Sequence, residues 1–294
     1  MDKVTLFLYF FMYNLEKYLN TRQDELISIS FQSDEANTDR PLKEYMKNII
    51  ERCQPDINRS TNISELIINN KLYKKEIVEN MFIQRVLLPE EINSTIKHII
   101  IENKPHSVYT NPDLCLEIND SGKLLYETIE LKTTKGNAIP GSSVQQVVPN
   151  EWAIFIKHTN RFASVTIGKY INAVTSTIQF PDRSPRPQVS FLELSNWNKE
   201  YRVENDKQLI YYNDPSIEEK CDIVNDWQEV LADRWMEIVF DEGTLRKKEP
   251  WFNNNIRKFA VKLINKYEML DDNSKNLLIN DLYRLIDEYE RNDD

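Results

Sequence analysis

The spacing of apolar residues changes twice along this chain, and the change limits the folds that the chain can adopt. After Pro105, short segments rich in β-branched and aromatic residues replace longer segments with helical spacing. Asp120–Gly122 is a turn signal between the first two short segments, and helical spacing returns near Ile217. We therefore expect an α/β (α+β) protein with a small mixed central β-sheet flanked by N-terminal and C-terminal helices. The expected strands are Leu114–Ile118, Leu124–Lys132, Trp152–His158 and Phe162–Ile167.

The same pattern divides the chain into three regions. Residues 1–104 are expected to be helical, residues 105–192 to form the β-sheet core, and residues 193–294 to be mainly helical, all within one compact domain. A proline followed by acidic residues suits a first helical turn, so one of these helices is expected to open at Pro89 and run to about Glu102. Pro41–Cys53 and Ser64–Leu88 are also expected to be helical, and two or three helices are expected from Ile217 onward, over Ile217–Val239, Trp251–Leu270 and Ser274–Arg291.

The N-terminal segment Val4–Tyr13 is a ten-residue apolar run. It is too short to span a bilayer, and charged residues rather than a small-residue cleavage site follow it. We expect a buried helix that continues through Leu15, Tyr18 and Leu19, in a cytoplasmic protein without a membrane partner. A true start at Met12 is the alternative.

Composition excludes several kinds of site. Three cysteines without a CxxC pair do not provide a disulfide framework or a cysteine zinc site. Three histidines and the absence of HExxH or GxxxxGK[ST] argue against a histidine-rich metal site and a P-loop. Five glycines in 294 residues also argue against a Rossmann fold, which uses glycine where the backbone approaches phosphates.

Charge is distributed unevenly. The net charge is −10, but residues 131–192 carry seven basic and two acidic side chains, whereas residues 214–294 carry 12 basic and 20 acidic ones. One interpretation is a basic face that meets a polyanion while the rest of the surface keeps the chain in solution. The alternative is an ordinary fluctuation in a solvated surface.

The segments Asn111–Leu116 and Glu130–Lys132 carry the chemically informative residues. Asp113 opens one expected strand, and Glu130 and Lys132 close the next, 17 residues later. Strand alternation places Glu130 and Lys132 on one side of their strand, with Leu131 on the other. Two carboxylates on adjacent strands can converge on one divalent cation, and hard oxygen ligands favour Mg²⁺.

This pattern resembles the PD-(D/E)xK nuclease superfamily, whose active site lies on such a hairpin. The resemblance covers about residues 85–170 and implies a restriction-endonuclease-like sheet. It assigns Asp113, Glu130 and the Leu131 main-chain carbonyl to the metal, with Glu90 or Glu91 as an additional acid, and Lys132 as the catalytic lysine. The alternative is a surface hairpin with an ordinary Glu–Lys pair. Similar dipeptides and acid-x-Lys triplets without this strand context occur at Pro55–Asp56, Pro181–Asp182, Glu102–Lys104 and Glu218–Lys220.

Within the superfamily, the chain most resembles a type II restriction endonuclease. Gln145 and Gln146 are followed by no tyrosine at the spacing of the Gln-x-x-x-Tyr element of recombination exonucleases, and resolvases are shorter. The resemblance implies Mg²⁺-dependent, sequence-specific hydrolysis of double-stranded DNA to 5′-phosphate and 3′-hydroxyl ends by a homodimer. A DNA methyltransferase would be its functional counterpart and not a stable subunit. A non-catalytic DNA-binding protein on the same fold, or a structure-specific DNA or RNA nuclease, are the alternatives.

Polar and basic residues after the motif are candidates for DNA contacts. Arginine suits guanine and glutamine suits adenine in the major groove, while lysine and serine suit phosphates. A structural connector with solvated arginines is the alternative for the proline-rich segment 179–188. The candidates are Lys135, Ser142, Ser143, Gln145, Gln146, Gln179, Arg183 and Arg186.

Overall fold

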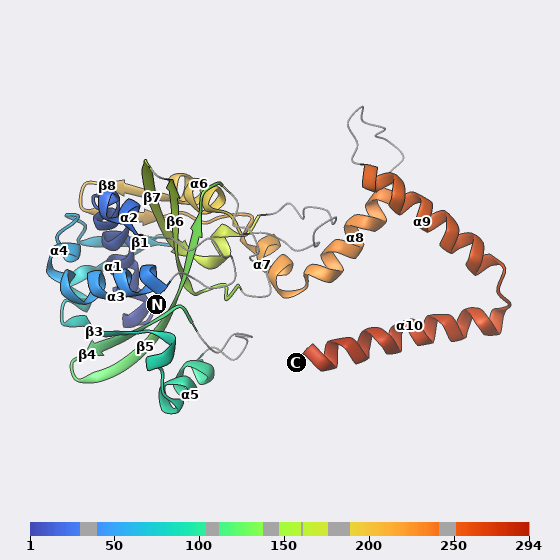
Figure 1. Cartoon of the computed structure of the whole chain (residues 1–294), viewed down its shortest axis with the longest axis horizontal. Helices are drawn as coiled ribbons and strands as arrows, with labels where there is room; N and C mark the ends of the chain where they lie inside the picture. The colour runs from blue at the N-terminus through green and yellow to red at the C-terminus, as the bar shows by residue number, and fades with distance from the viewer. Residues whose placement is uncertain are drawn as a thin grey trace. The chain divides into compact units, whose positions relative to one another are not determined.

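The computed structural model describes two compact units, which are considered separately. They comprise Met1–Trp227 and Gln228–Asp294. The described residues are 1–29, 40–103, 112–137, 147–159, 161–175, 189–240 and 251–293. The first unit is a mixed α/β structure with two mixed sheets flanked by helices, and the second consists of helices (Figure 1).

The larger sheet has the strand order β3-β4-β5-β6-β7. Its strands are β3 (Met81–Leu87), β4 (Leu114–Asp120), β5 (Lys123–Thr134), β6 (Trp152–Thr159) and β7 (Phe162–Lys169). Neighbouring strands are antiparallel except β5 and β6, which are parallel. All four strands expected from the sequence are confirmed, and the turn between β4 and β5 lies at Ser121–Gly122 as expected.

The expectation of a helix over Ser64–Leu88 is wrong. This stretch contains β1 (Glu65–Ile68), β2 (Lys71–Lys74) and β3, and Asn69 and Asn70 adopt positive φ between the first two strands. Asparagine tolerates this conformation, which a tight hairpin requires. β1 and β2 have only four residues each, and β1 and β3 pair with strands far along the chain, β9 and β4. Local periodicity carries no information about such partners.

A second sheet, which the sequence did not predict, has the order β2-β1-β9-β8. Its C-terminal hairpin consists of β8 (Arg202–Asn205) and β9 (Gln208–Tyr211) and lies in the stretch expected to be mainly helical. Asp206 has positive φ at the hairpin turn. The strands contain only four residues each, too few for a clear alternation in the sequence.

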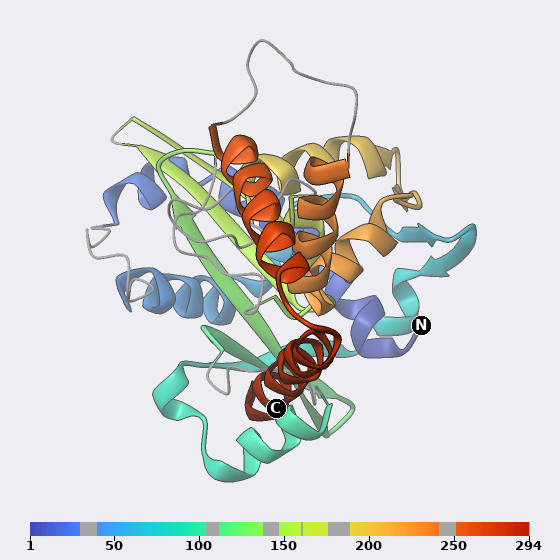
Figure 2. The same cartoon turned by 90° about the vertical axis from the view of Figure 1, so that its right-hand side faces the viewer.

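The expected N-terminal helix is confirmed as α1 (Lys3–Asn20), with Asp2 capping its first turn through the Thr5 N–H. Its apolar side chains pack with those of α3 (Arg40–Arg52) and with one face of the larger sheet. On the opposite face of β7, α6 (Phe191–Tyr201) packs so closely that a Cβ at Gly168 would lie 2.7 Å from Leu194. The larger sheet is therefore covered from both sides at β7 (Figures 1 and 2). The remaining helices of this unit are α2 (Gln23–Ser28), α4 (Gln54–Asn58), α5 (Ser94–Asn103) and α7 (Ile217–Asn225).

Pro89 begins a 3₁₀ turn, Pro89–Glu91, and not the helix that was expected there. The helix α5 starts five residues later at Ser94, because Ile92 is extended and ends the turn. The Glu91 side chain accepts the Leu88 N–H at 2.8 Å, which completes the turn locally. The proline signal therefore marked a helical turn correctly but not the helix after it.

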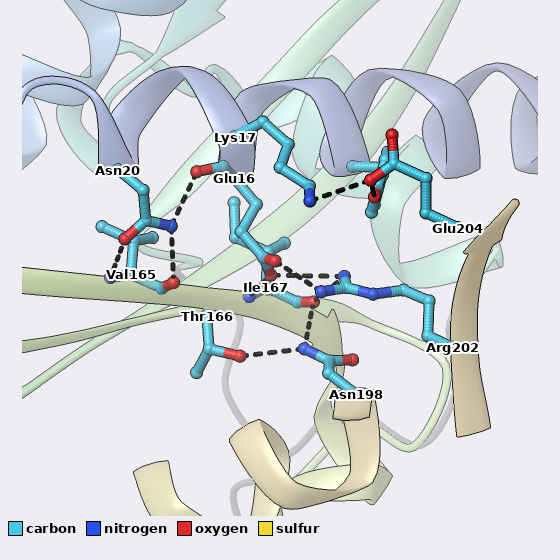
Figure 3. Close-up of polar contacts among 10 residues, drawn as sticks. Glu16, Lys17, Asn20, Val165, Thr166, Ile167, Asn198, Arg202 and Glu204 are labelled. Carbon is cyan, nitrogen blue, oxygen red and sulfur yellow. Dashed lines mark hydrogen bonds and ion pairs between the residues drawn. The ribbon is translucent and has the colours of Figure 1, made fainter. Parts of the chain in front are cut away.

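Side chains cover the outer edge of β7, which is the last strand of its sheet (Figure 3). Asn20 accepts the Val165 N–H and donates to the Val165 carbonyl, at 3.0 and 2.9 Å. Glu16 accepts the Ile167 N–H at 2.5 Å and forms an ion pair with Arg202. Arg202 and Asn198 both donate to the Ile167 carbonyl. These contacts satisfy backbone groups that would otherwise offer an open edge to another strand.

The second unit contains most of α8 (Trp227–Phe240), together with α9 (Trp251–Glu268) and α10 (Asp272–Asp293). The last two helices are as expected, whereas the stretch Ile217–Val239, expected as one helix, is divided at Asp226 into α7 and α8. Arg257 on α9 donates to the Ile238 carbonyl on α8 at 3.2 Å. No side chain described in α9 or α10 is buried. Among the helices of the described ranges, none combines the length and apolar character that a bilayer crossing needs.

Candidate metal site at the end of a β-hairpin

The hairpin β4–β5 brings together the acidic residues of the sequence motif. Leu114 pairs with Ile129 in the antiparallel register, so Asp113 and Glu130 follow as the next opposed positions. Asp113 Oδ2 accepts the Leu131 N–H at 2.9 Å, which fixes this carboxylate against β5. The two carboxylates therefore lie on adjacent strands at the same end of the hairpin.

Glu130 and Lys132 lie on the same side of β5, as the alternation predicts. The Lys132 Nζ is 2.6 Å from Glu130 Oε1, and 13% and 18% of the two side chains are exposed. The pKa of Glu130 is raised to about 7, first by burial and then by the negative charge of Asp113. Lys132 acts against this shift, and Glu151 adds a smaller upward contribution. Burial and the neighbouring Asp113 carboxylate therefore both favour the protonated form of Glu130.

A third group beside these carboxylates was not predicted. Lys43 on α3 places its Nζ 2.7 Å from Asp113 Oδ1, and only 16% of its side chain is exposed. Nothing in the sequence distinguishes Lys43 from the other lysines of an amphipathic helix. Glu151, which immediately precedes β6, was not predicted either. It lies near Glu130 because β5 and β6 pair in parallel, and the sequence does not indicate this pairing.

The two glutamates suggested as an additional acid face a different set of partners. Glu90 pairs with Arg40 at 3.0 Å, and Glu91 pairs with Lys47 at 2.5 Å. Burial acts to raise the pKa of Glu91, but the Leu88 N–H and Lys47 outweigh it and lower this pKa. Within the described ranges, no group of three or more His, Cys, Asp or Glu side chains is arranged to hold a metal, so neither glutamate joins Asp113 and Glu130.

The donors present nevertheless fit Mg²⁺. This ion is commonly held by one or two carboxylates together with water and substrate phosphates. A strand residue directs its N–H and C=O toward the same neighbour, so the Leu131 carbonyl faces the side on which Asp113 lies. The mutual repulsion of Asp113 and Glu130 is the electrostatic condition that a bound cation relieves.

Of the residues suggested for DNA contacts, Lys135 is exposed directly after β5. It is three residues from Lys132 in the sequence, and its side chain is on the surface. The other suggested residues lie outside the described ranges: Ser142, Ser143, Gln145, Gln146, Gln179, Arg183 and Arg186.

Comparison with known proteins adds no relative. No protein-family model matches the sequence, and no curated protein or solved structure is significantly similar to it.

Proposed function

We propose that this protein is a type II restriction endonuclease that hydrolyses double-stranded DNA in the presence of Mg²⁺. The observation that carries the proposal is the placement of Asp113 and Glu130 at opposed positions of one hairpin, with Lys132 bound to Glu130. A mixed sheet in which an antiparallel meander, β3–β5, continues into the parallel strand β6 is compatible with a restriction-endonuclease-like fold.

The proposed chemistry divides into roles for each group. When bound to Asp113, Glu130 and the Leu131 carbonyl, Mg²⁺ would polarise a phosphate oxygen and lower the pKa of a water molecule. The Lys132 ammonium would donate hydrogen bonds to the attacking water or to the phosphate, and so stabilise the charge that develops there. Asp113 is held against β5 by the Leu131 N–H. The products would carry 5′-phosphate and 3′-hydroxyl ends.

The proposed enzyme acts as a homodimer in the cytoplasm, since two copies are needed to cut both strands of a palindromic site. Large apolar side chains exposed on α9 and α10 support self-association, because each helix exposes them around more than one face. The two helices also have complementary charge, with net values of +3 for α9 and −3 for α10. A DNA methyltransferase is the proposed counterpart, acting separately on the same DNA sequence.

Digestion of unmethylated plasmid and phage DNA, in Mg²⁺ and in EDTA, tests this function. Discrete bands that require Mg²⁺ are expected. A continuous smear would exclude sequence specificity and favour a structure-specific or general nuclease. Binding of DNA in Ca²⁺ without cleavage in Mg²⁺ would favour the non-catalytic DNA-binding protein.

The site residues are tested by Asp113→Ala, Glu130→Ala and Lys132→Ala. Each is expected to lower the cleavage rate by about 10²-fold or more, because each removes a ligand or a charge at the reacting phosphate. Glu127→Gln is the matched control, since Glu127 lies on the same strand with its side chain on the opposite face. Wild-type cleavage by any of the three variants would remove that residue from the site.

A further inference from the structure

Asp113 forms an ion pair with the ammonium group of Lys43. Its Oδ1 lies 2.7 Å from the Lys43 ammonium, and 10% and 16% of the two side chains are exposed. Its Oδ2 accepts the Leu131 N–H. Because an unpaired buried carboxylate is costly, the ion pair with Lys43 offsets the burial of Asp113.

Lys43 is one of three basic residues that α3 presents on one face. Arg40, Lys43 and Lys47 are spaced by three and four residues, and all three form ion pairs with carboxylates. The pairs differ in exposure, since 50% of the Glu90 side chain and 39% of the Glu91 side chain are exposed. Lys43 therefore forms the most buried of the three pairs, and its partner is the proposed Mg²⁺ ligand.

We propose that Lys43 competes with the divalent cation for Asp113 and is displaced when the cation binds. This inference rests on the proposed function of the same hairpin. The Lys43 ammonium lies 2.7 Å from Asp113 Oδ1, the oxygen left open by the Leu131 N–H, and its repulsion of a cation bound there is weakly screened in a covered site. The displaced ammonium remains tethered to α3 beside the site, where an incoming phosphate supplies a new anionic partner.

Metal binding by the full-length, EDTA-stripped protein tests the competition without any cleavage assay. Mg²⁺ and Ca²⁺ are titrated calorimetrically into the wild type and into Lys43→Met, which keeps the length of the side chain but not its charge. Loss of one charged hydrogen bond to Asp113 is expected to tighten cation binding by about tenfold or more. Lys47→Met is the matched control and is expected to bind like the wild type, because its partner Glu91 is no ligand.

Two further variants keep the test decisive. Lys43→Arg retains the positive charge and is expected to bind the cation no more tightly than the wild type, even if Lys43→Met folds poorly. Asp113→Asn is expected to lose the cation. Unchanged or weaker binding by Lys43→Met would overturn the competition while leaving the nuclease proposal intact. Full cation binding by Asp113→Asn would overturn the proposed site itself and the competition with it.

Discussion

The helices α1 and α9 have the same length but differ in how much of their surface is buried. Each contains 18 residues, yet 12 residues of α1 are buried, whereas no described side chain of α9 is. Phe259 and Leu263 on α9 expose 63% and 48% of their surface. An apolar helix needs a surface to cover it, and only α1 has such a surface within its own unit.

The difference lies in polar contacts as well as in apolar burial. Glu16 and Asn20 of α1 bind backbone groups at the edge of β7, so the helix is held in one register against the sheet (Figure 3). In α9, Arg257 makes a hydrogen bond to the Ile238 carbonyl of α8. The position of α1 against the sheet is therefore fixed by hydrogen bonds from its side chains to the backbone of β7.

The largest effect is expected for Glu16→Gln. This change leaves Arg202 buried without its charged partner, and breaking one side of a buried pair costs about 3–5 kcal/mol of unfolding free energy. Lys17→Gln is the control, because its pair with Glu204 is about two-fifths exposed and contributes at most about 1 kcal/mol. Urea unfolding of both variants measures the difference. Equal losses would show that the edge contacts of β7 do not anchor α1.

An intermediate effect is expected from pH at the hairpin site. The folded-state pKa of Glu130 is raised from 4.5 to about 7, so its protonated form favours the folded state. This stabilisation is fully present below about pH 4.5 and is lost as the pH rises through 7, by an amount on the order of 2–3 kcal/mol. In EDTA, the wild type should therefore lose more unfolding free energy between pH 5 and pH 8 than Glu130→Gln. Parallel pH profiles for the two proteins would contradict the raised pKa.

The smallest effect on stability is expected in α9 and α10. Replacing Leu263 and Leu285 by glutamine should change the unfolding free energy of the first unit by no more than about 0.5 kcal/mol, because both side chains are exposed. The same double substitution should weaken the dimer at least about tenfold, as measured by light scattering over a range of concentrations. Asn265→Gln, an exposed polar change on α9, is the control. A dimer that survives the double substitution would place its interface elsewhere.

The fold was predictable where the chain repeats one period over enough residues. The helices α1, α3 and α8–α10 and the strands β4–β7 were expected from spacing alone, because each is long or clearly patterned. The strands β1, β8 and β9 have four residues each, and the sheet that contains them depends on the pairing of β1 with β9, which is distant in the chain.

In the candidate site, too, some residues could be expected from the sequence and others were found only in the tertiary structure. Sequence determined that Asp113, Glu130 and Lys132 share one hairpin end, because alternation and a glycine-containing turn are local properties. Only the tertiary structure decided that Lys43 pairs with Asp113, that Glu151 influences Glu130, and that Glu90 and Glu91 turn to Arg40 and Lys47. These contacts join elements separated by long stretches of chain. They depend on how α3 and β6 pack against the hairpin, and the local sequence pattern does not indicate this packing.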